Sequence, residues 1–137
     1  MADTFPAAGM EMTHILVVGD IDASRSFYRD VLGAEIIREY GGTSVVLRFA
    51  ESWLLLVTGG APTDDKPDVT MAPPADADTV AHAMTIRVPD CRAAYETLSA
   101  RGARFLTPPR DRGMEVRCFF RDPDGHLFEI SEAVGQS

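Results

Sequence analysis

Hydrophobic and polar positions follow the same order in two stretches of the chain. Apolar runs at residues 13–18 and 80–88 predict buried strands, and each leads into an acidic turn and then an apolar face with helical spacing. Gly33 and Gly102 follow these faces and are expected to end the two helices. Because repetition at a fixed offset usually reflects architecture, we predict two similar βαβββ units.

The remaining elements follow from caps and turn residues. Asp20 or Asp22 is expected to cap the first helix, whose buried face includes Phe27 and Tyr28, and Asp90 to cap the second. Gly41-Gly42 and the run Asp122-Pro123-Asp124-Gly125 predict hairpin turns. Further strands are predicted at residues 35–40, 44–49, 53–58, 104–106, 115–121 and 126–132.

A segment rich in proline and aspartate separates the two units. Residues 59–79 carry almost no large apolar side chain, which is typical of a linker. The predicted fold class is therefore α+β, with two tandem βαβββ modules at residues 12–58 and 80–132 forming a concave mixed sheet. Together they make one domain at residues 12–132.

Composition narrows the classes of partner. The formal net charge of −8 and the pI near 4.7 argue against nucleic acid, because phosphate binding needs clustered Lys and Arg. No apolar run approaches the roughly 20 residues that span a bilayer, and the N-terminus has no secretory pattern. Cys91 and Cys118 are too few for a disulfide framework. We expect a cytoplasmic protein that binds a small molecule, without nucleic acid or membrane partners.

Two of the three histidines occupy matching places in the repeat. His14 opens the first segment and His82 opens the second, and Glu129 lies between two apolar residues of the last strand. If equivalent strands line one concave sheet, these three side chains could hold a divalent metal with open coordination positions. The alternative for each histidine is a satisfied core residue. The third histidine, His126, is expected to be a turn residue.

The segments HILVVGDIDASRSFYRDVLGAE, HAMTIRV and RCFFRDPDGHLFEI resemble the vicinal oxygen chelate superfamily, over residues 12–132. That superfamily includes glyoxalase I, extradiol dioxygenases, fosfomycin-resistance enzymes, methylmalonyl-CoA epimerases and bleomycin-binding resistance proteins. The resemblance implies that His14, His82 and Glu129 are ligands of Fe(II), Mn(II), Ni(II) or Zn(II). It also implies a homodimer in which the sites are shared between chains.

The chain departs from the individual activities of that superfamily. No carboxylate lies in the strand predicted at residues 53–58, where glyoxalase I carries a further metal-binding glutamate. Leu16 stands where fosfomycin enzymes have a threonine, and their arginine beyond the last strand has no counterpart. His126 does not match the extra catalytic histidine of extradiol dioxygenases. The resemblance therefore indicates the fold more strongly than any one reaction.

Two functions from different classes remain open. The first is a metal-dependent enzyme with dioxygenase-like or lyase and isomerase chemistry, for which the sequence assigns no catalytic residue beyond the metal ligands. The second is a protein that sequesters a cytotoxic compound, with Trp53, Phe119 and Tyr40 as pocket walls. Arg117 would hold an anionic substrate in either case, and its alternative is a strand-end or interface arginine.

Overall fold

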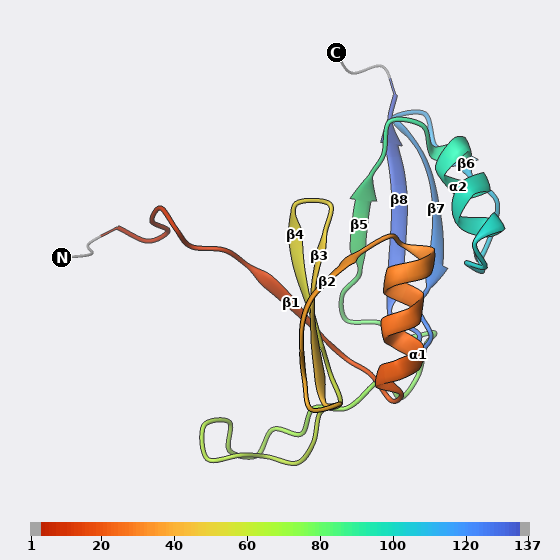
Figure 1. Ribbon diagram of the computed structural model, residues 1–137. Helices are drawn as coiled ribbons and strands as arrows, with labels where there is room; N and C mark the ends of the chain where they lie inside the picture. The colour runs from red at the N-terminus through yellow and green to blue at the C-terminus, as the bar shows by residue number, and fades with distance from the viewer. Residues whose placement is uncertain (1–3, 135–137) are drawn as a thin grey trace.

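Two four-stranded mixed sheets make up the β structure of the computed structural model, which describes residues 4–134 (Figure 1). The first sheet has the order β1-β4-β3-β2 and the second the order β5-β8-β7-β6. In each sheet the first strand pairs in parallel with the last, and the other pairs are antiparallel. The strands are β1 (Thr13–Val17), β2 (Glu35–Tyr40), β3 (Ser44–Phe49), β4 (Ser52–Val57), β5 (Met84–Arg87), β6 (Arg110–Asp111), β7 (Glu115–Arg121) and β8 (Leu127–Ala133).

The α+β class is confirmed, and one predicted strand is wrong. Residues 104–106 form only an isolated bridge between Phe105 and Phe120, and the edge strand that pairs with β7 is β6 instead. Pro108 and Pro109 lie between these two segments, and proline has no amide hydrogen to give to a ladder. The chain therefore rejoins β7 only after the prolines, for two residues.

Each unit contributes a capped helical segment. Asp20 accepts from the amides of Asp22 and Ala23 at the start of α1 (Ile21–Ser26), and Asp90 accepts from the amide of Ala93 at α2 (Cys91–Ala100). After α1 the chain widens into one π-helical turn, η1 (Phe27–Val31). The region described contains no helix long and apolar enough to cross a membrane.

One apolar core joins both sheets and both helices. Phe27 and Tyr28 of η1 lie 6.5 and 6.0 Å, between ring centroids, from Phe120 and Phe128 of the second sheet. The η1 turn therefore packs against β7 and β8, and α2 lies beside the same two strands, with Cys91 hydrogen-bonded to Glu132 and Ile130 of β8 (Figure 1). This shared core fixes how the two halves of the chain sit relative to one another.

The turn between β7 and β8 adds polar links between the halves. Asp122 accepts the Tyr28 hydroxyl at 2.6 Å, and Asp124 accepts the amide of Gly19 at 2.8 Å. His126 Nε2 lies 2.8 Å from the carbonyl oxygen of Val17, and the His126 side chain is buried. The prediction that His126 is a turn residue is confirmed, because its ring holds this turn against β1.

Candidate functional site

The pleat of the sheets decides which predicted site residues share a face. Leu16 and Val18 of the first unit are buried in the core, so His14 projects from the core side of the first sheet. In the second sheet Phe128 and Ile130 are buried, so Glu129 between them points to the opposite, outer face. His14 and Glu129 therefore project from different sides of their sheets.

His82 lies in the segment that leads into β5. The β5 and β8 register pairs Met84 with Phe128 and Thr85 with Glu129. Met84 and Ile86 therefore face the core side of β5, while His82 lies two residues before this strand, outside its pairing with β8. Its imidazole lines a separate cavity of about 320 Å³ that also contacts His126 and Val17. Glu129 does not line this cavity.

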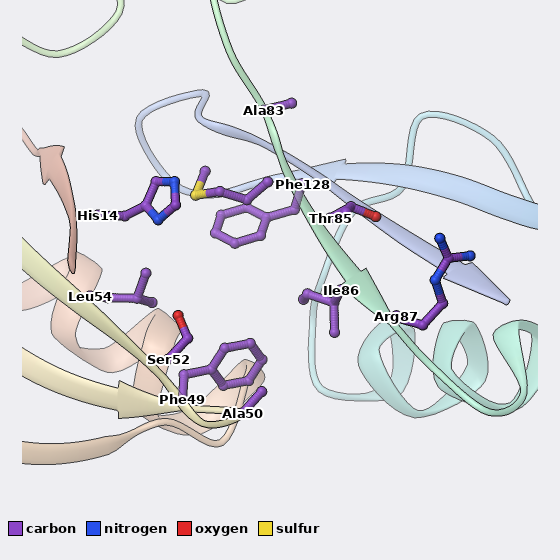
Figure 2. A pocket seen from close by; sticks show the side chains of 11 residues that line it. His14, Phe49, Ala50, Ser52, Leu54, Ala83, Thr85, Ile86, Arg87 and Phe128 are labelled. Carbon is purple, nitrogen blue, oxygen red and sulfur yellow. The ribbon is translucent and has the colours of Figure 1, made fainter. Parts of the chain in front are cut away.

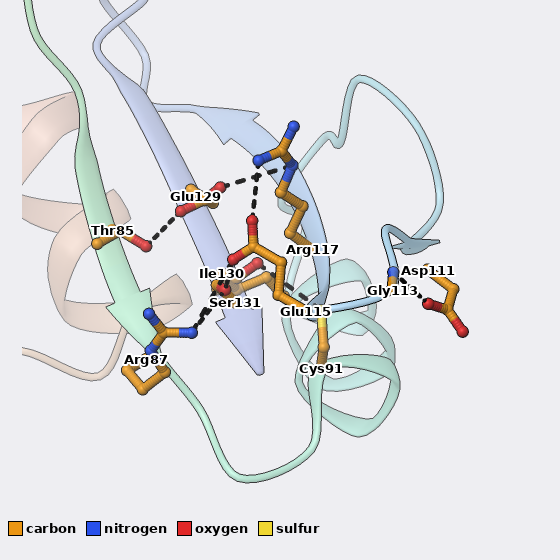
Figure 3. A network of polar contacts seen from close by, with 10 residues as sticks. All are labelled: Thr85, Arg87, Cys91, Asp111, Gly113, Glu115, Arg117, Glu129, Ile130 and Ser131. Carbon is orange, nitrogen blue, oxygen red and sulfur yellow. Dashed lines mark hydrogen bonds and ion pairs between the residues drawn. The ribbon is translucent and has the colours of Figure 1, made fainter. Parts of the chain in front are cut away.

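Glu129 is already engaged by its neighbours on the outer face (Figure 3). Its carboxylate accepts the Thr85 hydroxyl at 2.5 Å, and the Arg117 Nε lies 3.9 Å away. Arg117 also donates to Glu115 at 2.8 Å, and Glu115 accepts from Ser131 at 2.6 Å. The hydrogen bond from Ser131, and to a smaller extent the one from Arg117, hold the pKa of the Glu115 carboxyl below its usual value. The outer face of the second sheet thus carries a connected polar network.

The donor set of one chain does not fit a metal centre. Within residues 4–134, no group of three or more His, Cys, Asp or Glu side chains is placed to hold a metal ion. A divalent ion in proteins needs three or more converging ligands, and His14, His82 and Glu129 lie on three different surfaces. The predicted metal triad stays a prediction, and it would need an assembly of chains.

A cleft of about 490 Å³ opens where the two sheets meet (Figure 2). Its floor and walls are mostly apolar, and polar groups lie at its rim. This volume lies within the range of pockets that hold small organic molecules, roughly 300 to 1,000 Å³. The lining residues are His14, Phe49, Ala50, Ser52, Leu54, Ala83, Met84, Thr85, Ile86, Arg87 and Phe128.

The hairpin between β3 and β4 forms one lip of the cleft in an unfavourable backbone conformation. Ala50 and Glu51 have φ values of +46° and +63°, in the left-handed region that favours glycine. A two-residue turn of this kind is normally Asn-Gly or a similar pair. Non-glycine residues in this region cost of order 1 to 3 kcal/mol each, and such strain tends to occur at ligand sites. The strained turn presents Phe49 and Ala50 to the cleft.

The three predicted substrate-binding residues lie outside the cleft. Arg117 and Phe119 share the outer face of the second sheet, with the guanidinium carbon of Arg117 5.8 Å from the ring centroid of Phe119. Trp53 lies on the outer face of the first sheet, where the guanidinium carbon of Arg48 is 4.7 Å from the Trp53 ring centroid. Tyr40 is half exposed at the end of β2, also away from the cleft.

Most residues of the cleft could not be predicted from the sequence. The sequence predicted that Met84 and Ile86 share a strand face with His82. It could not predict that they line one cleft with the β3–β4 hairpin, because this depends on how the two halves of the chain pack. One sequence feature did point to this region. The tight turn Ala50-Glu51 lacks the glycine or asparagine that such a hairpin favours, and this indicates a strained backbone there.

Neither cysteine is a candidate nucleophile. Both thiols are buried, and Cys91 Sγ donates weakly to the Ile130 carbonyl oxygen at 3.7 Å. Burial raises the pKa of Cys118 to about 12, and burial also raises the pKa of Cys91. The thiolate that nucleophilic chemistry requires is therefore scarce at neutral pH.

The chain is similar to known proteins both in sequence profile and in fold. The profile of the Glyoxalase/Bleomycin resistance protein/Dioxygenase superfamily matches residues 11–130. Lactoylglutathione lyase from Agrobacterium tumefaciens superposes with a TM-score of 0.68 at 22% identity, covering 93% of this chain and 95% of that one.

Two further solved structures differ in what their names describe. The fosfomycin resistance protein FosX from Listeria monocytogenes has a TM-score of 0.67 at 18% identity, with 94% of this chain and 96% of that chain covered. A mutant of FosX was solved with Mn(II) and a dihydroxypropylphosphonic acid. TnmS3, an antibiotic-binding protein from Streptomyces sp. CB03234, has a TM-score of 0.65 at 18% identity, with 93% and 98% covered. At these identities the likeness concerns the fold.

Proposed function

Because the chain belongs to the Glyoxalase/Bleomycin resistance protein/Dioxygenase superfamily, we propose that it binds a small, mainly apolar organic molecule in the cleft between its sheets, without a metal ion. The observation that carries this proposal is the separation of His14, His82 and Glu129 onto different surfaces, beside a preformed apolar cleft. The antibiotic-binding protein TnmS3 has the same fold, so a role in binding is compatible with this architecture.

The chemistry of the lining indicates the kind of molecule. Phe49, Phe128 and Met84 offer two aromatic rings and a polarizable thioether, which suit an aromatic or polycyclic ligand. His14 lies at the rim, where its imidazole can donate or accept one hydrogen bond with a polar substituent, and the Thr85 hydroxyl, which already donates to Glu129, can accept one. The ligand we expect is a flat molecule with an apolar body and few polar groups.

A neutral fluorescent aromatic tests the proposal. We expect 1-aminoanthracene to bind the protein in the presence of EDTA, and Ser52→Trp to weaken binding at least about tenfold by filling the cleft. Ser99→Trp is the matched control, because Ser99 is exposed on α2 and does not line the cleft. Equal loss in both variants, or binding that appears only when metal is added, would refute a metal-free cleft site.

A metal-dependent enzyme is the second candidate, since FosX shares the fold and binds Mn(II) in its complex. For this candidate, His14, His82 and Glu129 would converge only across two chains, and the bound ion would act as a Lewis acid or an oxygen-activating centre. Metal content after anaerobic loading with Fe, Mn, Ni or Zn separates the candidates. Near one ion per chain, lost in His82→Ala, favours the enzyme, and none in any load favours binding alone.

We also propose that the protein is a homodimer. The strands β1 and β5 each end a sheet, and β1 carries the half-exposed side chain of Ile15. Exposed sheet edges with apolar side chains are commonly covered by another chain.

A further inference from the structure

Three arginines surround a hollow on the outer face of the second sheet, beyond the polar network of Glu129. The hollow measures about 270 Å³ and is lined by Thr107, Arg110, Arg112, Arg117, Cys118 and Phe119. The β6 and β7 register places Arg110 directly opposite Arg117. Residues opposite each other in an antiparallel pair share one face, so both guanidinium groups project from the same side.

The arginines of this hollow are only partly paired with carboxylates. Arg117 is paired with Glu115 at 2.8 Å and lies 3.9 Å from Glu129, but within residues 4–134 neither Arg110 nor Arg112 takes part in an ion pair. The positive charge left beside the hollow is therefore that of Arg110 and Arg112, in a chain whose net charge is −8. Like charges placed opposite each other destabilise a strand pair.

The fold itself does not require these arginines. Arg110 and Arg112 are exposed, so their long side chains contribute little to packing. The nearby Asp111 carboxylate makes no ion pair with them within residues 4–134, and it accepts the amide of Gly113 at 2.8 Å (Figure 3). An anion between the guanidinium groups would remove their repulsion.

The guanidinium groups and the lining indicate the class of anion. A phosphate monoester carries about −1.5 to −2 at neutral pH and three acceptor oxygens, and a single carboxylate offers less charge and fewer oxygens to Arg110 and Arg112. Arginine forks bind phosphoryl oxygens in pairs. The half-buried ring of Phe119 provides an apolar surface beside them for an organic group.

We infer that this hollow binds the phosphoryl group of an organic phosphate monoester, with Arg110, Arg112 and Arg117 on its oxygens and Phe119 against its organic part. The site is separate from the cleft between the sheets, so it neither requires nor excludes the function proposed above.

Calorimetric titration with phenyl phosphate, inorganic phosphate and benzoate tests the inference. Phenyl phosphate is expected to bind most tightly, with benzoate at least about tenfold weaker because it carries one charge fewer. Arg110→Gln and Arg112→Gln should each weaken phenyl phosphate about fivefold or more. The control Arg92→Gln removes the same charge from an exposed position on α2 and should leave binding unchanged.

Phe119→Leu separates the two parts of the site. The variant should lose the advantage of phenyl phosphate over inorganic phosphate and keep the affinity for inorganic phosphate. The inference is overturned if Arg92→Gln weakens binding as much as Arg110→Gln, if benzoate binds as well as phenyl phosphate, or if no phosphate binds. Ser52→Trp, which fills the cleft, should not change phosphate binding, so failure here is distinct from failure of the cleft proposal.

Discussion

At the scale of single residues, the hydrogen bond between Tyr28 and Asp122 joins the two halves of the chain inside the core. Both side chains are buried, and burial raises the pKa of the Asp122 carboxyl and of the Tyr28 hydroxyl. A buried acceptor that loses its donor incurs most of its desolvation cost. The link therefore matters more to stability than a surface hydrogen bond of the same length.

Tyr28→Phe should lower the free energy of unfolding by about 1 to 3 kcal/mol, because it leaves a buried Asp122 oxygen without its hydroxyl donor. Urea denaturation measures the change. Tyr40→Phe is the matched control, because Tyr40 is half exposed and should change stability by less than about 0.5 kcal/mol. Equal effects of the two substitutions would mean that the Tyr28 hydroxyl contributes nothing specific.

Glu115 gives the second residue-scale prediction, on pH. Its contacts with Ser131 and Arg117 hold the pKa of the folded carboxyl below the usual 4.5. A lowered pKa stabilises the fold above 4.5, and this stabilisation is lost as pH falls through the folded value. Between pH 5 and pH 3, roughly, the wild type should lose more stability than Glu115→Gln.

The control for this pH series is Glu96→Gln on α2, whose side chain makes no ion pair within residues 4–134. This variant should keep the pH dependence of the wild type. Parallel curves for wild type and Glu115→Gln would show that the Glu115 contacts do not act on stability.

The alternation of side chains between the two faces of a strand also shows what could be predicted from the sequence. The alternation His14, Leu16, Val18 was readable from the chain, and the buried Leu16 and Val18 confirm it. What the sequence could not show is that Glu129 projects from the other side, because that depends on which face of β8 packs on the helices. A shift of one position reverses the face of a strand residue, so a matching place in a repeat is not enough to define a metal site.

At the scale of elements, the strands with tight turns were predictable and the irregular ones were not. β2, β3 and β7 have the predicted bounds, since alternation and glycine turns specify them. The strand predicted at residues 104–106 failed because its apolar residues resemble a strand while the prolines that follow displace the pairing. The π turn of η1 has no signal in an apolar helical pattern.

The strained hairpin between β3 and β4 provides the element-scale prediction. Glu51→Gly should raise the free energy of unfolding by about 0.5 to 1 kcal/mol, because glycine relieves the φ of +63° at a smaller entropic cost. Thermal or urea denaturation gives the value. Glu35→Gly is the control, since Glu35 is exposed in β2 without a positive φ and should be destabilised by the same change.

If the strain serves the cleft, the same variant should bind 1-aminoanthracene more weakly while being more stable. Phe49 and Ala50 reach the cleft through this turn, and a relaxed turn would hold them less firmly. Glu51→Gly protein that is less stable than the wild type would contradict the assignment of strain to this hairpin.

At the scale of the whole molecule, the arrangement of the two sheets was beyond the sequence. The repeat predicted equivalent halves, but contacts such as those from Tyr28 to Asp122 and from His126 to Val17 join residues far apart in the chain. These contacts create the cleft, and no pattern within one module encodes them. The predicted fold of two βαβββ modules is confirmed, and its mixed β structure consists of two four-stranded sheets that share a core.

The uncovered edges of those two sheets lead to the last prediction. Sedimentation at micromolar concentration should give about twice the 14.9 kDa chain mass, because the backbone edge of β1 and the half-exposed Ile15 favour a second chain. Ile15→Lys should shift the protein toward monomer, since a charge in a dry interface is costly. Leu106→Lys is the control, because Leu106 is as exposed as Ile15, at 51% and 50%, but lies in the other half of the chain. A monomeric wild type would refute the proposed dimer, and it would also rule out a metal site that needs ligands from two chains.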